Sequence, residues 1–366
     1  MKIKISRNML LPALQASNNV VERRQALPIL SNLLIQIENN NIKLTATDLE
    51  VELRSICVAE EATNGDIALS ARKLFDICRA LPSESEITIE NAGTKTNVTS
   101  GRSRFSLSTM KAEYFPSIGS FEALATFEID RDIFSDLLES TLFAMAHQDV
   151  RYYLNGLLLE LEAKQIRAVA TDGHRLAVSE IPLTLAVEKP TQIIIPRKGV
   201  MEIVRLLSGA PDKIKVNVGE NHLSVDGGSQ TLTTKLVEGV FPDYNRVIPR
   251  DSQCTIVADR ETLRAGLGRA SILSNEKFRG VRLILSGDLL KAIAHNPEQE
   301  EAEEEIEIQY DGPKLEVGFN VSYLLDVLGT MTSDSIKIEL KDANSSCLIY
   351  SEENDSTRYV VMPMRL

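Results

Sequence analysis

A compact group of polar side chains occurs at residues 171–176, in the run Thr-Asp-Gly-His-Arg-Leu. Asp172, His174 and Arg175 are of types that hydrolases use, since a carboxylate can orient a histidine that acts as a general base. One hypothesis is therefore a hydrolase built on these three residues. The alternative is a turn, because Asp-Gly favours turns and a nearby polar side chain can bond to the backbone. The sequence favours the turn, since no nucleophile motif accompanies the group.

Motifs of several common enzyme classes are missing from the sequence. It holds no G-x-x-x-x-G-K-[ST] loop, no G-x-G-x-x-G, no H-E-x-x-H and no G-x-S-x-G. The histidines and cysteines are few and far apart, without metal-ligand spacing or a Cys-x-x-Cys pair: His147, His174, His222 and His295, with Cys57, Cys78, Cys254 and Cys347. This distribution argues against structural zinc and against a disulfide framework, and it suits a reducing cytoplasm. We expect no metal and no cofactor.

Length and charge narrow the class of protein further. A chain of 366 residues exceeds the size at which single hydrophobic cores stop growing, so two or three domains are expected. The first residues alternate polar and apolar types, which predicts a strand rather than a signal peptide, and no apolar run is long enough to span a membrane. The formal net charge is -12. An acidic body repels a polyanion, so DNA could be a partner only where positive charge is localised.

The chain contains three copies of one pattern, in which two strand-like runs end on a polar residue. Asp48, Asp172 and Asn296 close the pattern, each 124 residues after the one before. Helix-like segments follow at 70–81, 196–207 and 320–328, and an earlier one opens each copy near 7–18, 130–146 and 259–273. The repeated unit is a strand, a helix and three strands, present twice per copy. Hairpin spacing of the strands predicts an α+β fold with antiparallel sheets, and turn residues put the domain boundaries at 1–124, 125–250 and 251–366.

Two oppositely charged segments lie in different copies. Residues 298–307 are rich in glutamate, while Arg102 and Arg104 lie in a β-patterned run that places Phe105 and Leu107 on its other face. A solvated acidic edge strand is the simpler interpretation of the glutamates. The alternative is a head-to-tail contact between an acidic edge and a basic one, which closes into a ring when the rotation allows. Exposed ion pairs contribute only about 0 to 1 kcal/mol each, so apolar residues would supply most of the affinity.

Several segments together resemble the β subunit of bacterial DNA polymerase III, the sliding-clamp family. They are residues 100–109, 145–156 with the sequence Met-Ala-His-Gln-Asp-Val-Arg-Tyr-Tyr-Leu-Asn-Gly, 171–176, 273–280, 296–304 and 359–366. The resemblance runs along essentially the whole chain. It implies a processivity factor without enzymatic activity: a head-to-tail homodimer of three-domain subunits that encircles duplex DNA with helices inward and sheets outside. It also implies an ATP-driven clamp loader, and polymerases and mismatch-repair proteins that dock by short peptides.

The resemblance also implies site residues. Those expected around a docked peptide are Leu154, Thr171, Gly173, His174, Arg175, Leu176, Pro242, Val247, Asn320, Tyr323, Ser346, Val360, Val361, Met362, Pro363, Met364 and Arg365. Methionine adapts to varied ligand shapes, which suits such a surface, although a terminal core strand is the alternative for residues 360–364. Asn344 stands where well-known relatives carry an apolar residue, so the peptide preference stays open.

Two further sets come from the same resemblance. The expected DNA contacts are Arg24, Gln148, Tyr152, Tyr153, Arg197 and Lys198. The expected dimer contacts are Lys73, Arg102, Arg104, Phe105 and Leu107 against Ile272, Leu273, Glu298, Glu300, Glu301, Glu303 and Glu304. Tyr152 and Tyr153 could instead belong to a strand edge. A monomeric peptide-binding adaptor unrelated to DNA would keep the peptide site and lose the ring.

Overall fold

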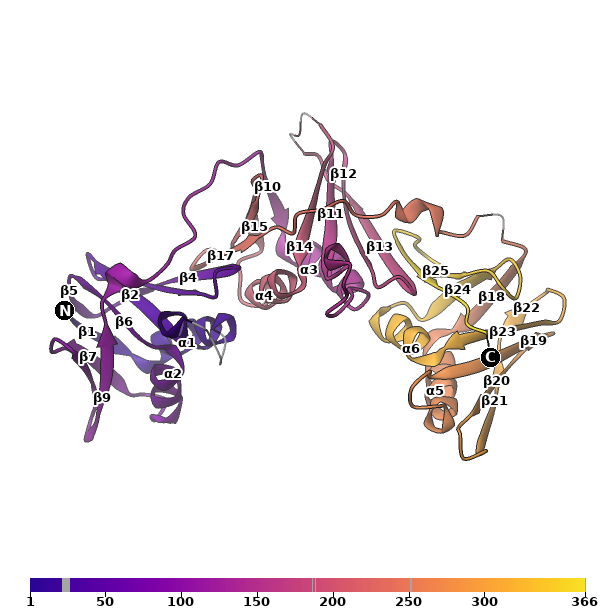
Figure 1. Cartoon of the computed structure of the whole chain (residues 1–366), viewed down its shortest axis with the longest axis horizontal. Helices are drawn as coiled ribbons and strands as arrows, with labels where there is room; N and C mark the ends of the chain where they lie inside the picture. The colour runs from indigo at the N-terminus through magenta and orange to yellow at the C-terminus, as the bar shows by residue number, and fades with distance from the viewer. Residues whose placement is uncertain (22–26, 186, 188, 251, 366) are drawn as a thin grey trace. The chain divides into compact units, whose positions relative to one another are not determined.

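The computed structural model describes the chain except for residues 22–26, 186, 188, 251 and 366. The chain divides into two compact units. Figure 1 labels the helices and strands that they contain. The first unit holds residues 1–135 and 198–236, and the second holds 136–197 and 237–366. The second of the three sequence repeats therefore contributes to both units. None of the helices in the described part of the chain is long and apolar enough to cross a membrane.

Each repeat contains the predicted unit of a strand, a helix and three strands twice over. Repeat one comprises β1 (Lys2–Ser6), α1 (Arg7–Val20), β2 (Asn32–Glu38), β3 (Asn41–Thr47) and β4 (Val51–Val58), a short β5 (Glu61–Thr63), then β6 (Gly65–Ser70), α2 (Ala71–Ala80), β7 (Glu86–Asn91), β8 (Lys95–Ser100) and β9 (Ser103–Met110). Repeat two comprises β10 (Ala125–Asp130), α3 (Arg131–Leu142), β11 (Gly156–Glu162), β12 (Gln165–Thr171), β13 (Arg175–Pro182), β14 (Thr191–Pro196), α4 (Arg197–Leu207), β15 (Lys213–Val218), β16 (His222–Asp226) and β17 (Gln230–Lys235).

Repeat three follows the same order with one short extra strand. It comprises β18 (Cys254–Asp259), α5 (Arg260–Ala270), β19 (Gly280–Ser286), β20 (Leu289–His295), β21 (Glu301–Glu307), the short β22 (Gln309–Tyr310), β23 (Leu315–Asn320), α6 (Val321–Thr330), β24 (Ser335–Leu340), β25 (Cys347–Ser351) and β26 (Thr357–Val361). In the described part of the chain, five short 3-10 helices occupy connections: η1 (Pro28–Ser31), η2 (Ala112–Tyr114), η3 (Tyr152–Leu154), η4 (Tyr244–Arg246) and η5 (Ser271–Leu273).

Local chemistry sets where the helices begin and end. The side chain of Asn320 accepts a hydrogen bond from the Ser322 amide at 2.9 Å, and that of Asp259 accepts one from the Thr262 amide at 2.7 Å, so polar caps start α6 and α5. The helix predicted for 130–146 ends earlier, at Leu142. There the Ala144 amide bonds to the Thr141 carbonyl, a tightened i to i+3 turn that stops the helix.

The strands form antiparallel sheets, which confirms the predicted α+β class. The described strands of the first unit form a sheet of 13 strands, and those of the second unit form sheets of nine and four strands. Two strand pairs connect different repeats: β4 with β17 in the first unit, and β13 with β26 in the second. Each of these junctions joins the fourth strand of one repeat to the last strand of the next. Helices pack against the sheets, as α1 does against β3 and β4.

The polar residues that recur every 124 positions have the same structural role in each repeat. Asp48 accepts hydrogen bonds from the amides of Glu50 and Val51, at 2.9 and 2.7 Å. Asp172 accepts the equivalent bonds from His174 and Arg175, at 2.9 and 3.1 Å. The side chain of Asn296 accepts one from Glu300 at 2.8 Å across a longer connection. Each side chain closes the turn between two paired strands, so the repeat reflects a conserved turn geometry within one chain.

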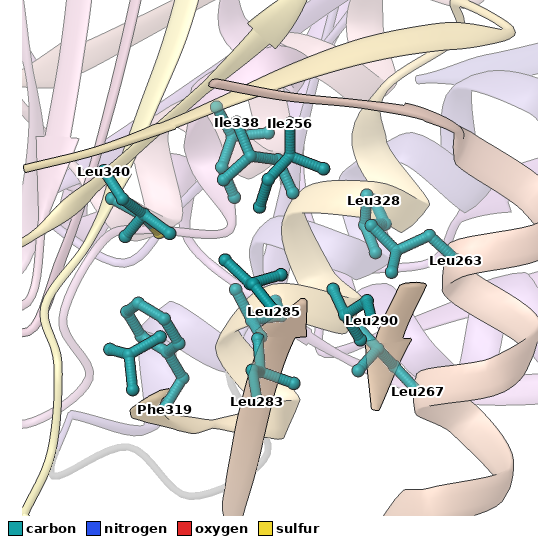
Figure 2. A pocket seen from close by; sticks show the side chains of 14 residues that line it. Ile256, Leu263, Leu267, Leu283, Leu285, Leu290, Phe319, Leu328, Ile338 and Leu340 are labelled. Atoms are coloured by element: carbon teal, nitrogen blue, oxygen red, sulfur yellow. The ribbon is translucent and has the colours of Figure 1, made fainter. Parts of the chain in front are cut away.

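The core of the third repeat contains a cavity of about 20 Å³ (Figure 2). Side chains of α5, α6 and the surrounding strands line it, among them Leu267, Leu285, Leu328 and Phe319. All of its lining residues are apolar or cysteine. A water molecule held there would find none of the polar partners that it needs, so we interpret the space as a packing defect of the core.

Candidate functional site

The residues predicted to bind a peptide lie in the second unit, around the junction of β13 and β26. Leu176 lies opposite Val360 in this pair. Both are part of a buried apolar group, the junction cluster, whose members are Ala146, Leu154, Leu158, Val169, Leu176, Val178, Ile194, Phe241, Tyr244, Leu348 and Val360. Val247 packs against the cluster and is half-buried. Segments far apart in the sequence therefore converge on one apolar base.

Arg175 is the polar centre of this region. Its guanidinium lies 4.7 Å from the centre of the Tyr323 ring and 5.2 Å from that of Phe143. It also donates hydrogen bonds to the carboxylates of Asp172 at 3.0 Å and Asp326 at 2.5 Å. Burial and the nearby carboxylate of Asp172 raise the pKa of the Tyr323 hydroxyl. A planar cation held between two rings and two carboxylates is fixed in orientation, and it keeps Tyr323 in place on α6.

Residues 171–176 form the turn that the sequence favoured. Thr171 donates its hydroxyl proton to the carbonyl of Arg175 at 2.6 Å, and its oxygen accepts from the Gly173 amide at 3.0 Å. Gly173 has φ +91°, and a Cβ there would lie 3.0 Å from the guanidinium of Arg151. A side chain there would be strained by the positive φ and would push the flexible end of Arg151 aside, so the backbone conformation is what explains the glycine.

The geometry of this turn does not match the hydrolase hypothesis. Asp172 is occupied by two backbone amides and by Arg175. The ring of His174 instead stacks on Tyr323, with centroids 6.3 Å apart. The exposed ring presents a flat surface beside the junction cluster, which suits packing against a ligand. Within the described residues, no group of three or more His, Cys, Asp or Glu side chains is placed to hold a metal ion.

The end of the chain runs from the core to this surface. Val360 and Val361 are buried in β26, as the core-strand alternative predicted. Beyond the strand, the Met362 amide donates to the carbonyl of His174 at 2.9 Å, and the Met364 amide donates to Gly318 at 2.9 Å. Met362, Pro363 and Met364 are half-buried. Two anchoring bonds therefore hold a partly exposed segment with two methionines alongside the turn.

The remaining predicted peptide contacts lie in varied settings. Pro242 is exposed beside the buried Phe241, Ser346 is half-buried directly before β25, and Arg365 is exposed. Asn320 caps α6 as described above. Asn344 is exposed in the turn between β24 and β25, where its amide donates to Asp342 at 2.8 Å. Its side chain is thus available to solvent in a tight turn rather than packed in the junction cluster.

Comparison with known proteins identifies the family. Models of the N-terminal, central and C-terminal domains of the DNA polymerase III beta subunit match residues 1–119, 128–243 and 245–365. The beta sliding clamp of Pseudomonas aeruginosa is 49% identical and that of Escherichia coli K12 is 45% identical, each with 100% of both chains covered. The chain belongs to the beta sliding clamps of DNA polymerase III.

Solved clamps share the fold as well as the sequence. A Pseudomonas aeruginosa clamp, crystallised with griselimycin, matches with a TM-score of 0.97 at 49% identity and 100% coverage of both chains. A Caulobacter crescentus clamp matches with a TM-score of 0.96 at 35% identity, over 100% of this chain and 99% of that one. The three-domain clamp fold is therefore confirmed. As a member of a family of processivity factors, the chain acts in DNA replication and is not an enzyme.

A second group of predicted contacts in this clamp forms an exposed loop in the second unit. Tyr152 has 58% of its surface exposed, whereas Tyr153 packs against the junction cluster. Both lie in η3, so neither belongs to a strand edge. Gln148 is exposed with φ +56°. A hydrogen bond from Arg151 lowers the pKa of the Asp149 carboxyl to about 2. The same bond holds the loop that leads into the two tyrosines.

The basic residues predicted to contact DNA are partly engaged by the protein. Arg197 donates to the Met145 carbonyl at 3.2 Å. In the first unit, Lys198 pairs with the carboxylate of Asp48 and donates to the Val20 carbonyl at 3.1 Å. Lys198 thus has a structural partner that the sequence did not reveal. Arg24 lies outside the described residues.

The predicted dimer contacts follow two strands of the clamp fold. Arg104, Phe105 and Leu107 lie on β9 in the first unit, and Glu301, Glu303 and Glu304 lie on β21 in the second. Arg102 was expected on the strand face with Arg104, and this was wrong: it occupies the two-residue turn between β8 and β9, beside Gly101 with φ +53°. Lys73, Glu298 and Glu300 are exposed, as is Ile272 at 75%, and Leu273 is half-buried.

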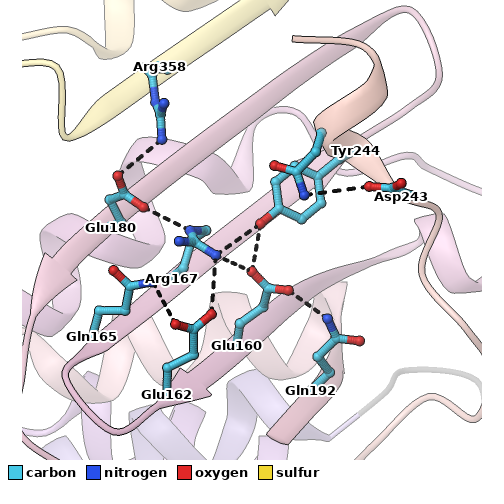
Figure 3. A network of polar contacts seen from close by, with 10 residues as sticks. Glu160, Glu162, Gln165, Arg167, Glu180, Gln192, Asp243, Tyr244 and Arg358 are labelled. Atoms are coloured by element: carbon cyan, nitrogen blue, oxygen red, sulfur yellow. Dashed lines mark hydrogen bonds and ion pairs between the residues drawn. The ribbon is translucent and has the colours of Figure 1, made fainter. Parts of the chain in front are cut away.

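Sequence reasoning missed a set of polar residues beside the junction cluster, four of them on the sheet and one, Tyr244, in η4. Glu160, Arg167, Glu180, Tyr244 and Arg358 form a connected network in the second unit (Figure 3). From the sequence, the spacing of Glu160 and Arg167 predicts at most that the two residues face each other across one β-hairpin. The register that aligns four strands is not visible in the sequence.

Proposed function

We propose that this clamp forms a head-to-tail homodimeric ring, encircles duplex DNA without sequence specificity, and docks its partners through short peptides. The observation that carries the ring is a repeated type of strand junction. β4 pairs with β17, and β13 pairs with β26. In both cases the fourth strand of one repeat meets the last strand of the next. The equivalent strands that remain are β21 of repeat three and β9 of repeat one, so a third junction of the same type would join two copies of the chain.

Both of these strands have a free edge within the described part of the chain. Residues 103–108 of β9 pair with β8 alone, because β6 meets only Thr109 and Met110. β21 pairs with β20 alone at the end of its sheet. An unpaired strand edge is a template for pairing with another chain, and a heterologous junction repeated twice closes a ring when the rotation allows.

The two existing junctions specify a register for the third. Thr231 lies opposite Arg54, and Arg358 lies opposite Val178. Arg104 takes the equivalent place in β9, since Arg104, Thr231 and Arg358 are equally spaced along the chain.

Glu303 takes the equivalent place in β21. Arg54, Val178 and Glu303 lie opposite Thr45, Val169 and Ile293 of the preceding strands, and these three are also equally spaced. A third junction in the register of the first two would therefore place Arg104 of one copy opposite Glu303 of the other.

Charge supports this register. At the second junction, Arg358 bonds to Glu180, two residues beyond the position directly opposite it. The equivalent partner of Arg104 is Glu305, which together with Glu303 already surrounds Lys291 at 3.2 and 2.7 Å. Arg104 would thus join an alternating set of charges. Phe105, 36% exposed, and Ile272 supply apolar surface for the contact.

Binding to DNA in this proposal is topological. A net charge of -12 disfavours tight electrostatic binding, so the ring holds DNA by enclosing it, with weak contacts from Gln148, Tyr152, Tyr153 and Arg197. Exposed Tyr152 is suited to stacking or backbone contact. The same proposal places the domain boundaries at 1–124, 125–250 and 251–366. It also gives the clamp a cytoplasmic location and, as partners, a clamp loader, DNA polymerases and mismatch-repair proteins.

The peptide-docking surface is the junction cluster with Arg175, His174, Tyr323 and the segment Met362–Arg365. It combines an apolar base, fixed aromatic rings and adaptable methionines, which are features of peptide recognition. Griselimycin is bound to the Pseudomonas aeruginosa clamp, and we propose that it binds this clamp at the docking surface, so it serves as a probe. Failure of every peptide tiled along the cognate polymerase III catalytic subunit to bind would contradict this part of the proposal.

A charge-swap experiment tests the ring. Arg104→Glu should raise the dimer dissociation constant by at least about tenfold in sedimentation, and the double variant Arg104→Glu/Glu303→Arg should recover most of the loss. Lys164→Glu, in the exposed turn between β11 and β12, is the matched control and should leave the dimer unchanged. A wild-type protein that sediments as a monomer at micromolar concentration would favour the adaptor alternative.

Retention on DNA tests enclosure separately. Wild-type clamp loaded on a nicked circle should stay bound through a high-salt wash and dissociate after one restriction cut linearises the DNA. Equal retention on both forms would contradict encirclement.

A further inference from the structure

Tyr244 connects the apolar junction cluster of the second unit to charged side chains on its sheet. It lies in η4, in the connection between repeats two and three. Its ring is buried in the junction cluster, with 6% of its surface exposed. Its hydroxyl leaves the cluster and donates a proton to Glu160 at 2.6 Å, while Arg167 donates to the same hydroxyl oxygen at 3.2 Å.

The sheet beneath Tyr244 carries an apolar row and a charged row on one face. Leu158 lies opposite Ile194 and Val169, and Val169 lies opposite Val178. A second row lies two residues farther along the same four strands. It consists of Gln192, Glu160, Arg167 and Glu180, which lie opposite one another in the same register. Residues two apart on a strand share a face, so both rows point to the same side.

Within the second row, Glu160, Arg167 and Glu180 alternate in charge, and each bonds to its neighbour. Glu160 accepts from Gln192 at 2.6 Å and from Arg167 at 2.8 Å. Glu180 accepts from Arg167 at 2.9 Å and from Arg358 of β26 at 3.0 Å (Figure 3). Glu160 is buried, and Arg167 and Glu180 are partly buried. Several charge-assisted bonds between them hold a defined geometry, because displacing one side chain breaks the bonds of its neighbours. The row is therefore a rigid attachment point.

We propose that Tyr244 is a positioning residue of the peptide-docking surface, which it serves by fastening the connection at 241–247 to the charged row of the sheet. This inference rests on the proposed docking function. Burial and the bond to Glu160 raise the pKa of the Tyr244 hydroxyl, so it remains a proton donor at physiological pH.

The segment that Tyr244 fastens carries two of the predicted peptide contacts. Val247 follows η4 directly, and its amide bonds to the Tyr244 carbonyl at 3.1 Å. Pro242 lies two residues before Tyr244, next to Phe241 of the junction cluster. The segment has no strand partner of its own within the described residues. Its position over the apolar row thus depends on the packing of Phe241, Tyr244 and Val247 against the junction cluster and on one side-chain hydroxyl.

Replacing Tyr244 with phenylalanine in the full-length clamp tests the proposal, because it removes the hydroxyl and keeps the ring. Tyr310→Phe is the matched control. Tyr310 is equally buried and donates its hydroxyl proton to the Pro313 carbonyl at 2.7 Å, in β22, outside the junction cluster. The probes are griselimycin and the best-binding fluorescent peptide from a set tiled along the cognate polymerase III catalytic subunit. Amide hydrogen exchange of residues 241–248 is measured in parallel.

Tyr244→Phe should bind the probes about three- to tenfold more weakly, through faster dissociation, and should exchange the amides of 241–248 faster. Tyr310→Phe should match wild type in both measurements while losing similar thermal stability. Wild-type affinity and wild-type exchange in Tyr244→Phe would overturn the inference, as would equal weakening by both substitutions. Absence of probe binding by the wild type would count against the docking function itself, and the exchange measurement would still decide whether Tyr244 holds the segment.

Discussion

Lys198 forms an ion pair with Asp48, whose side chain is only 3% exposed, although 150 residues separate the two in sequence. The lysine comes from α4 and the aspartate from the turn after β3. The pairing assigns a structural task to a residue that family resemblance associates with DNA. Substitutions of Lys198 therefore report on stability as well as on DNA contact.

We expect Lys198→Met to lower the free energy of unfolding by about 2 to 3 kcal/mol, because it leaves a buried carboxylate without its partner. This value lies just below the usual range of about 3 to 5 kcal/mol for a broken buried pair. The reason is that 27% of the lysine side chain is exposed and that Asp48 keeps its bonds to two backbone amides. Urea denaturation checks it. The control is Lys164→Met, which removes an exposed lysine from a turn and should change stability little. A Lys198→Met protein with wild-type stability and weakened DNA binding would show that the ion pair contributes nothing to the fold.

His174→Ala should weaken peptide binding about fivefold, because the ring that stacks on Tyr323 provides flat apolar surface at the docking site. Fluorescence anisotropy with a labelled peptide measures the change. His147→Ala removes an exposed ring from the neighbouring loop and serves as control. Unchanged peptide affinity, together with loss of a hydrolytic activity present in the purified wild type, would instead revive the hydrolase hypothesis.

Glu202→Gln should leave stability unchanged or raise it at pH 8. Burial raises the pKa of the Glu202 carboxyl above its ordinary 4.5, despite the favourable charges of Arg205 and Lys198. The fold therefore disfavours the ionised form, and this cost develops as pH rises from about 4.5 through the folded pKa. The difference between variant and wild type should shrink near pH 4.5.

Thermal melts across this pH range measure the effect of Glu202→Gln. In Glu261→Gln, the matched control, an exposed carboxyl with a lowered pKa is removed, so no gain at pH 8 is expected. A Glu202 variant that is clearly less stable than wild type at pH 8 would mean that its bond to Arg205 outweighs the burial.

The thiols of the native clamp should react slowly with Ellman's reagent at pH 8. All four cysteines are buried, and burial raises the pKa of Cys78 to about 11 and that of Cys347 to about 12. Reaction needs an exposed thiolate, so it should follow local opening of the fold. Four thiols should react at once in guanidinium. A fast-reacting thiol in the native protein would mean that one of these sites opens readily.

The repeat and the helix positions could be predicted because they depend on local patterns. Asn320 and Ser70 cap helices where the sequence placed helix starts, and the strand alternation gave the α+β class. The turn at 171–176 was also predictable, since Asp-Gly chemistry acts over a few residues.

Interactions between distant segments could not be predicted. The bond from Tyr244 to Glu160 spans 84 residues, and the pair Lys198 and Asp48 spans 150. Such contacts depend on strand register and on packing between repeats, and a single sequence encodes neither locally. The misplaced Arg102 has a similar cause: alternation alone does not reveal where a strand ends and its turn begins.

The same Thr-Asp turn follows β3 and β12, but its aspartate has a different partner in each place. In the first unit, the buried carboxylate of its aspartate is paired with the partly exposed Lys198. In the second, the same fold element directs an arginine toward two aromatic rings at the surface. The turn after β3 thus stabilises the fold, whereas the turn after β12 helps to shape a surface. Substitutions around the second turn can therefore change that surface without weakening the ion pair at the first.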